Sequence, residues 1–155
     1  HLMSGWIIGY IAFNNSPQLD NIRENLPKLA RVRISTNLPV QYAALESLNG
    51  PQDYIPKFVS ELKTHRDYVI KRLNEMNGIS CSNPKGAFYA FPKIEQNKFS
   101  SDKEFVLELL KQKGVLTVHG SGFGAQYGSG HFRIVYLPKM EILESAMNKI
   151  EDFVR

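Results

Sequence analysis

The sequence predicts an α/β fold, in which helices and short strands are mixed along one chain. Three observations carry this prediction. The chain has 155 residues, 43% of them hydrophobic and 22% charged, which is enough to bury a core. Apolar residues recur at three- and four-residue steps in some segments, as in helices, and alternate in others, as in strands. After residue 78 these segments follow one another as β-β-α-β-β-α, so at least one antiparallel hairpin is expected.

Composition and charge exclude several classes of protein. The longest apolar stretch is far shorter than the roughly 20 residues that a membrane-spanning helix needs, and no charged-then-apolar leader indicates a secretory signal. The net charge is only +4, without a run of basic residues, so no nucleic-acid partner is expected. Cys81 is the single cysteine. It favours a reducing, cytoplasmic setting, and no metal-ligand spacing is present.

The first 50 residues predict one strand and two helices. Trp6–Phe13 is rich in β-branched and aromatic residues, which favours a buried strand. Ser16 is a suitable N-cap and Pro17 a suitable first residue for a helix that extends to about residue 30. Pro27 is expected to kink or break this helix. A shorter helix is predicted over Gln41–Leu48.

A long amphipathic helix is predicted over Tyr54–Met76. Its apolar positions recur at helical spacing. They are Phe58, Leu62, His65, Val69, Leu73 and Met76. Because His65 lies on this stripe, it is expected to be a core histidine. Asp67 and Lys71 are spaced to form an ion pair, and Asn77-Gly78 ends the helix.

The remaining elements follow in short succession. Two strands, Ile79–Ser82 and Ala87–Phe91, are joined by a turn at residues 83–86. The capping box Ser101–Glu104 opens a helix that Gly114 closes. Strands at residues 115–118 and 131–136 and a last helix at residues 140–154 complete the order.

The loop between the last two strands, residues 119–130, is rich in glycine. It follows a strand, as phosphate-binding loops do, but it lacks a Gly-Lys-Ser/Thr sequence, and no helical pattern follows it. A loop with unusual backbone angles is therefore favoured over independent nucleotide binding. His119 and His131 flank it, but no carboxylate at metal or triad spacing supports a catalytic role for either histidine.

Arg133 is the sharpest candidate for a binding residue. Alternation places Phe132, Ile134 and Tyr136 on one face of the strand, and His131, Arg133 and Val135 on the other. An arginine between apolar neighbours is expensive to bury unless it is paired. Its planar fork suits a carboxylate, so the residues alone leave two interpretations open: a structural ion pair or a ligand carboxylate.

Five segments together resemble the class I/II aminotransferases, which are fold-type I pyridoxal-phosphate enzymes. Each resembles a family motif, and they occur in the family's order. The segments are Gly5–Tyr10, Gln41–Leu48, Gly86–Pro92, Val118–Gly124 and His131–Ile134.

The resemblance implies a domain organisation and a role for Arg133. Residues 1–50 would be the C-terminal edge of the large cofactor-binding domain. Residues 51–155 would be the small α+β domain, including the long interdomain helix. Arg133 matches the arginine that binds the substrate α-carboxylate. The parent enzyme would use pyridoxal phosphate to move an amino group between an amino acid and a 2-oxo acid. It would be a homodimer that includes an N-terminal part missing here.

Two departures from the family pattern affect the expected activity. The family's Schiff-base lysine falls two positions before His1, so the 155 residues alone are expected to be inactive, with no catalytic residue of their own. The family arginine that pairs with the cofactor phosphate is Ile7 here, so no cofactor-binding residue is assigned. The alternatives are a lyase or inactive homologue on the same fold, or a free-standing α/β module that binds a carboxylate.

If the parent is larger, apolar surface should be exposed where its other parts would pack. We expect such surface on Trp6–Phe13 and around Gln41–Leu48.

Overall fold

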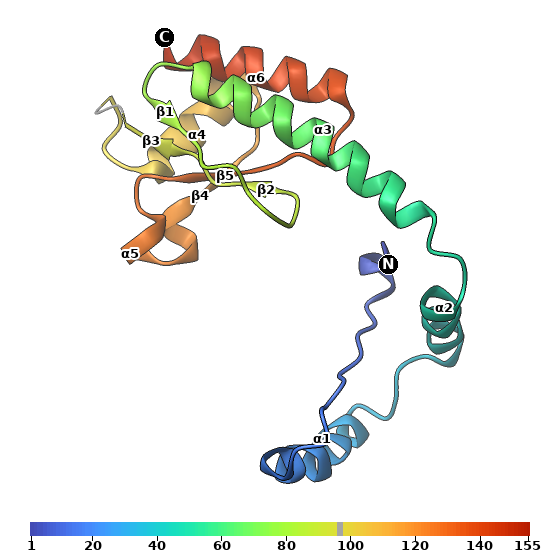
Figure 1. Ribbon diagram of the computed structural model, residues 1–155. Helices are drawn as coiled ribbons and strands as arrows, with labels where there is room; N and C mark the ends of the chain where they lie inside the picture. Colours follow the sequence, from blue (N-terminus) through green and yellow to red (C-terminus); the bar gives the residue numbers. More distant parts are fainter. Residues whose placement is uncertain (96–97) are drawn as a thin grey trace. The chain divides into compact units, whose positions relative to one another are not determined.

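The computed structural model describes residues 1–95 and 98–155 and divides into two compact units, His1–Pro56 and Lys57–Arg155 (Figure 1). The helices are α1 (Asp20–Val32), α2 (Leu38–Asn49), α3 (Tyr54–Glu75), α4 (Asp102–Lys113), α5 (Ala125–Gly128) and α6 (Met140–Val154). The strands are β1 (Ile79–Ser80), β2 (Tyr89–Ala90), β3 (Lys93–Ile94), β4 (Val118–His119) and β5 (Phe132–Val135). Three 3₁₀ helices are η1 (Ser4–Trp6), η2 (Pro17–Leu19) and η3 (Gly120–Phe123). Among the described residues, no helix is long and apolar enough to cross a membrane.

The strand predicted over Trp6–Phe13 is wrong. This segment holds the end of η1 followed by irregular chain, and residues 1–56, all of which are described, contain no strand. A strand needs a neighbour to receive its backbone hydrogen bonds, and this unit offers none. The apolar side chains are exposed instead: Ile7 is 84% and Tyr10 72% accessible. The same holds on α2, where Tyr42 and Leu45 are 66% and 55% accessible, so both segments expose the apolar surface that was expected.

Pro27 does not break the helix that contains it. After the short turn η2, α1 runs through Pro27 to Val32, slightly beyond the predicted end. Proline removes one backbone donor but leaves the turns on either side intact. The second helix, α2, begins three residues earlier than predicted, with Pro39 in its first turn, where a missing N–H matters least.

In the second unit, a three-stranded antiparallel sheet has the order β2-β5-β4. Tyr89 pairs with Val135, and Val118 with Arg133. The predicted strands at 79–82 and 87–91 do form, in shorter versions, but they lie in different sheets: β1 pairs with β3, which the sequence analysis missed. A two-residue strand is too short to show alternation. The antiparallel pair β4–β5 spans the glycine-rich loop.

Side chains from one face of β5 join α3, α4 and α6 in the core. Phe132, Ile134 and Tyr136 are buried, as the alternation predicts. The C-terminal two thirds of the α3 stripe is also buried, and Arg72 links α3 to Glu151 of α6 at 2.8 Å; the two helices run side by side (Figure 1).

Of two predictions for polar residues of α3, one is confirmed and one is wrong. His65 is buried, and its Nδ1 lies 3.2 Å from the carbonyl oxygen of Tyr136, which confirms a core histidine. The predicted Asp67–Lys71 pair is wrong. Asp67 pairs with Arg66 at 2.6 Å, and Lys71 approaches Glu75 at 3.8 Å.

The predicted ends of α4 are confirmed. The Ser101 side chain accepts a hydrogen bond from the backbone N–H of Glu104 at 3.1 Å, and Gly114 closes the helix in the left-handed region at φ 67°. The Glu104 carboxylate accepts from the backbone N–H of Ser100 rather than of Ser101, so the capping box is shifted by one residue.

Candidate functional site

The guanidinium of Arg133 lies between two aromatic rings. Its central carbon is 4.5 Å from the ring centre of Tyr89 and 4.4 Å from that of Phe123. Tyr89 comes from β2, next to β5 in the sheet, and Phe123 from η3 in the glycine-rich loop. Both contacts are cation–π interactions, and they fix the plane of the guanidinium.

Neighbouring aromatic side chains support this clamp. Phe91 packs edge-on against Phe123 with ring centres 6.1 Å apart, and it stacks on His131 at 5.1 Å. His131 also places its Nδ1 2.9 Å from the carbonyl oxygen of Ser129. His131 therefore packs beside the Arg133 clamp.

The Arg133 side chain forms no ion pair and no hydrogen bond with any of the described residues. Its Nε is buried without a hydrogen-bond partner. The other arginines of this unit contrast with it: Arg66, Arg72 and Arg155 each hold a carboxylate. Within the described residues, a structural ion pair at Arg133, one of the two interpretations left open by the sequence, is therefore not found.

The glycine-rich loop is built on the close approach of two of its glycines. A Cβ on Gly128 would lie 2.0 Å from the carbonyl oxygen of Gly120, and a Cβ on Gly120 would lie 2.3 Å from that of Gly128. Only glycine fits at both positions. The base of the loop is closed by a hydrogen bond from the Gly120 N–H to the carbonyl of His131 at 2.8 Å.

The prediction of unusual backbone angles in this loop is confirmed at Gly124 and Gly130, whose φ angles are 127° and 72°. No helix follows the loop, as the sequence predicts, because β5 comes next; two short helices that the sequence did not predict, η3 and the single turn α5, lie inside the loop. Each has four residues, too few to show helical periodicity.

Asp102, at the start of α4, is hydrogen-bonded to this loop. Its carboxylate is buried and accepts the backbone N–H of Ser121 at 2.6 Å. His119 completes the group: its Nδ1 is 3.0 Å from the Ser121 hydroxyl oxygen and accepts the N–H of Gly122 at 3.2 Å. Two backbone N–H groups of η3 are thus bound by side chains, and His119 has a structural role in the loop.

Several influences act on the pKa of Asp102. Burial, the largest, raises it, but hydrogen bonds from the backbone and side chain of Ser121 and from the Asp102 backbone, together with the charge of nearby His119, bring the pKa below its usual range.

We predict that Asp102 makes stability depend on acid pH. Because its folded pKa is below the unfolded value of about 3.9, the unfolded chain binds the proton first. The contribution is therefore complete above that value and lost as the pH falls through the folded pKa. Urea unfolding at neutral and strongly acid pH should show a smaller acid loss of unfolding free energy in Asp102→Asn than in the unmodified chain. An equal loss in both would contradict the assignment.

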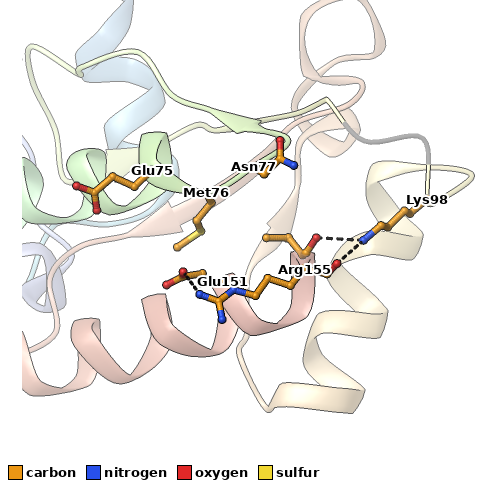
Figure 2. A pocket seen from close by; sticks show the side chains of 7 residues that line it. Glu75, Met76, Asn77, Lys98, Glu151 and Arg155 are labelled. Atoms are coloured by element: carbon orange, nitrogen blue, oxygen red, sulfur yellow. Dashed lines mark hydrogen bonds and ion pairs between the residues drawn. The ribbon is translucent and has the colours of Figure 1, made fainter.

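One cavity of the second unit, of about 550 Å³ along β4 and α6, has Arg133 in its lining but neither Tyr89 nor Phe123. Another, of about 620 Å³, lies between the C-terminal ends of α3 and α6 and includes Lys98, which donates to the carbonyl oxygens of Val154 and Arg155 (Figure 2). It contains neither Arg133 nor its aromatic neighbours. Concavity alone therefore does not locate the candidate site; the unpaired guanidinium does.

In the first unit, Ile7 occupies the position at which the resemblance expects a phosphate-binding arginine. It is exposed, with a positive φ of 52°, and its hydrocarbon side chain offers no donor to a phosphate. This residue does not fit the phosphate of pyridoxal phosphate. The described residues also contain no group of three or more potential metal ligands.

The sequence of the chain matches a known protein family. The family profile described as aminotransferase class I and II matches residues 1–150. The chain belongs to this family. The match covers both units, and the fold is that of the fold-type I enzymes.

Individual relatives are also aminotransferases. The glutamate-pyruvate aminotransferase AlaA of Haemophilus influenzae is 40% identical over 84% of this chain and 33% of its own length. A probable aspartate/prephenate aminotransferase of Rhizobium leguminosarum is 37% identical over 99% of this chain and 39% of its own. Among solved structures, alanine aminotransferase from Pyrococcus furiosus superimposes with a TM-score of 0.93 and 51% identity, over 98% of this chain and 39% of that one. The chain thus spans between 33% and 39% of the length of these relatives.

Sequence reasoning found Arg133 but missed the residues around it. Tyr89 could have been predicted, because alternation in the predicted strand Ala87–Phe91 places it on the same face as Phe91. Phe123 did not, since a loop gives no periodicity from which to place a side chain. Asp102 was assigned only to a helix cap.

Proposed function

We propose that Arg133 binds the carboxylate of an amino acid and of a 2-oxo acid in a parent enzyme that transfers amino groups through pyridoxal phosphate. The observation that supports this most is the guanidinium held between Tyr89 and Phe123 without an acidic partner among the described residues. Its place in the chain also matches the family's substrate-binding arginine.

A guanidinium binds a carboxylate at its edge, where its donors form two parallel hydrogen bonds. The rings of Tyr89 and Phe123 contact the guanidinium through cation–π interactions, which do not use these donors. An unpaired buried donor is unfavourable. A carboxylate would supply the acceptors that the described residues do not.

A titration with a simple carboxylate tests this role. Propionate added to the 155-residue chain should shift the Arg133 Hε resonance more than those of Arg66 and Arg72, which already hold carboxylates. Propionamide, similar in shape but uncharged, is the control and should shift none of them. Equal, small shifts at all three arginines would contradict the proposal.

We further propose that the 155 residues do not catalyse the reaction alone. The resemblance places the Schiff-base lysine outside them, and Ile7 cannot pair with a phosphate. Pyridoxal phosphate added to the chain should therefore give no visible absorbance band of an imine with a lysine. Borohydride reduction should accordingly label no one specific lysine. Such a band, mapped by mass spectrometry, would overturn this part.

The parent enzyme's partners follow from the same proposal. We infer two partners: a second copy of the enzyme, which forms a homodimer, and the N-terminal part of the same enzyme. The exposed apolar residues of the first unit support both. The family match across both units favours this interpretation over a free-standing carboxylate-binding module.

One observation supports a second candidate, an inactive homologue or a lyase on the same fold. It is Ile7, which stands where the family pattern has arginine. Ile7→Arg in the parent enzyme should tighten pyridoxal phosphate binding if the aminotransferase site is otherwise complete. No gain in cofactor affinity would favour a homologue that holds its cofactor differently or does not use it.

A further inference from the structure

Asp102 lies on a different element from Arg133, yet both contact η3. The Asp102 carboxylate, only 5% exposed, accepts the N–H of Ser121 at 2.6 Å, and Phe123, two residues further along η3, lies on the Arg133 guanidinium. Burying a carboxylate costs free energy unless its oxygens accept hydrogen bonds. Here its described partners belong to the loop and to the start of α4.

The geometry of η3 makes this hydrogen bond a strong constraint on the position of Phe123. The first N–H groups of a helix have no partner within it, and in η3 two of them are taken by Asp102 and His119. Gly124, which follows Phe123, has φ 127° and opens the chain to conformations that other residues avoid. The position of η3 is therefore set from its N-terminal side, where Asp102 provides the only charged hydrogen-bond acceptor among the described contacts.

We propose that Asp102 is a positioning residue for Arg133: its carboxylate holds η3 so that the Phe123 ring lies against the guanidinium and presents it to a ligand carboxylate. The effect of Asp102 on ligand binding rests on the proposed function of Arg133. Its effect on the contact between Phe123 and Arg133 does not, because this contact exists in the chain without a ligand.

The first test therefore needs no ligand. In the unmodified chain, the Phe123 ring should shift the Arg133 Hε resonance upfield, and Phe123→Leu should remove its share of that shift. Asp102→Ala removes the acceptor of the Ser121 N–H and should release η3 from its place beside the guanidinium. The ring-current shift at Arg133 should fall with it.

Two further variants separate positioning from a general loss of structure. Asp102→Asn keeps an acceptor oxygen for the Ser121 N–H and should restore most of the ring-current shift. Glu104→Gln removes an acid from the same first turn of α4, but its carboxylate contacts Ser100 and not the loop. It should leave the Arg133 resonance unchanged. If Asp102→Ala also leaves that resonance unchanged, or if Asn fails to rescue it, the positioning role is overturned.

A propionate titration of the same variants then tests the consequence for binding. Affinity should fall about two- to fivefold in Asp102→Ala, the usual worth of one exposed cation–π contact, and recover in Asp102→Asn. If the unmodified chain shows no Arg133 response to propionate, the proposed function fails while the ring-current result still decides the role of Asp102. An unchanged affinity in a variant that has lost the ring contact would overturn the link to the ligand.

Discussion

Arg133→Gln is expected to reduce the affinity of the chain for propionate by about tenfold or more. Glutamine keeps much of the side chain's length but loses the charge and the fork of parallel donors, and a hydrogen bond to a charged group is usually worth about 1.5–3 kcal/mol. Titration followed by chemical shifts in the unmodified and variant chains measures the change.

Arg133→Lys separates charge from geometry. Lysine keeps the charge but cannot form two parallel hydrogen bonds or lie flat between the rings of Tyr89 and Phe123. It should bind propionate with intermediate affinity. Arg66→Gln is the matched control, because Arg66 already holds Asp67, and it should not change the affinity. If Arg133→Gln binds propionate as well as the unmodified chain, the carboxylate does not bind at Arg133.

The sequence predicts best those elements whose apolar residues recur regularly on one buried face. The helix α6 has the predicted bounds, and α4 has the predicted cap and end. The buried face of β5 is also as predicted, because Phe132, Ile134 and Tyr136 alternate without interruption. In each case, burial of a periodic apolar face determines both the pattern and the structure.

The elements that the sequence mispredicts depend on contacts that no local pattern records. Trp6–Phe13 has the composition of a strand but no strand to pair with in its unit. Asp67 is correctly spaced for Lys71, yet the adjacent Arg66 reaches it instead. Local spacing identifies possible partners, and the rest of the fold selects among them.

The candidate site likewise combines a residue that the sequence predicts with neighbours that it does not. Arg133 could be singled out because a charge in an apolar strand is unusual. The Phe123 ring lies in a loop that the Asp102 carboxylate binds, and the path of this loop depends on two glycines eight positions apart, Gly120 and Gly128. No periodicity encodes that path. The sequence therefore singles out the arginine, whereas only the fold places its neighbours.

Gly128→Ala is expected to destabilise the second unit by about 1–3 kcal/mol, the usual range for overpacking. The new Cβ would lie 2.0 Å from the carbonyl oxygen of Gly120, which is backbone and has no rotamer with which to move away. The loop must therefore shift, and Phe123 with it. Urea unfolding measures the first effect, and loss of the ring-current shift at Arg133 measures the second.

Gly86→Ala is the matched control, because nothing lies within 4 Å of a Cβ at that position. It should leave both measurements unchanged or raise stability slightly by restricting the unfolded chain. An unfolding free energy for Gly128→Ala equal to that of Gly86→Ala would contradict the close contact.

The double variant Gly120→Ala/Gly128→Ala tests whether the two glycines form one contact. Each single alanine is expected to push the same two backbone segments apart, since each new Cβ meets the carbonyl of the other glycine. Once the first has done so, the second should add less than its own separate effect. Such subadditivity is the signature of directly coupled sites, whereas independent sites add within about 0.3–0.5 kcal/mol. Strict additivity would mean that the two glycines are required for separate reasons, and that the loop holding Phe123 over Arg133 is not closed by their mutual approach.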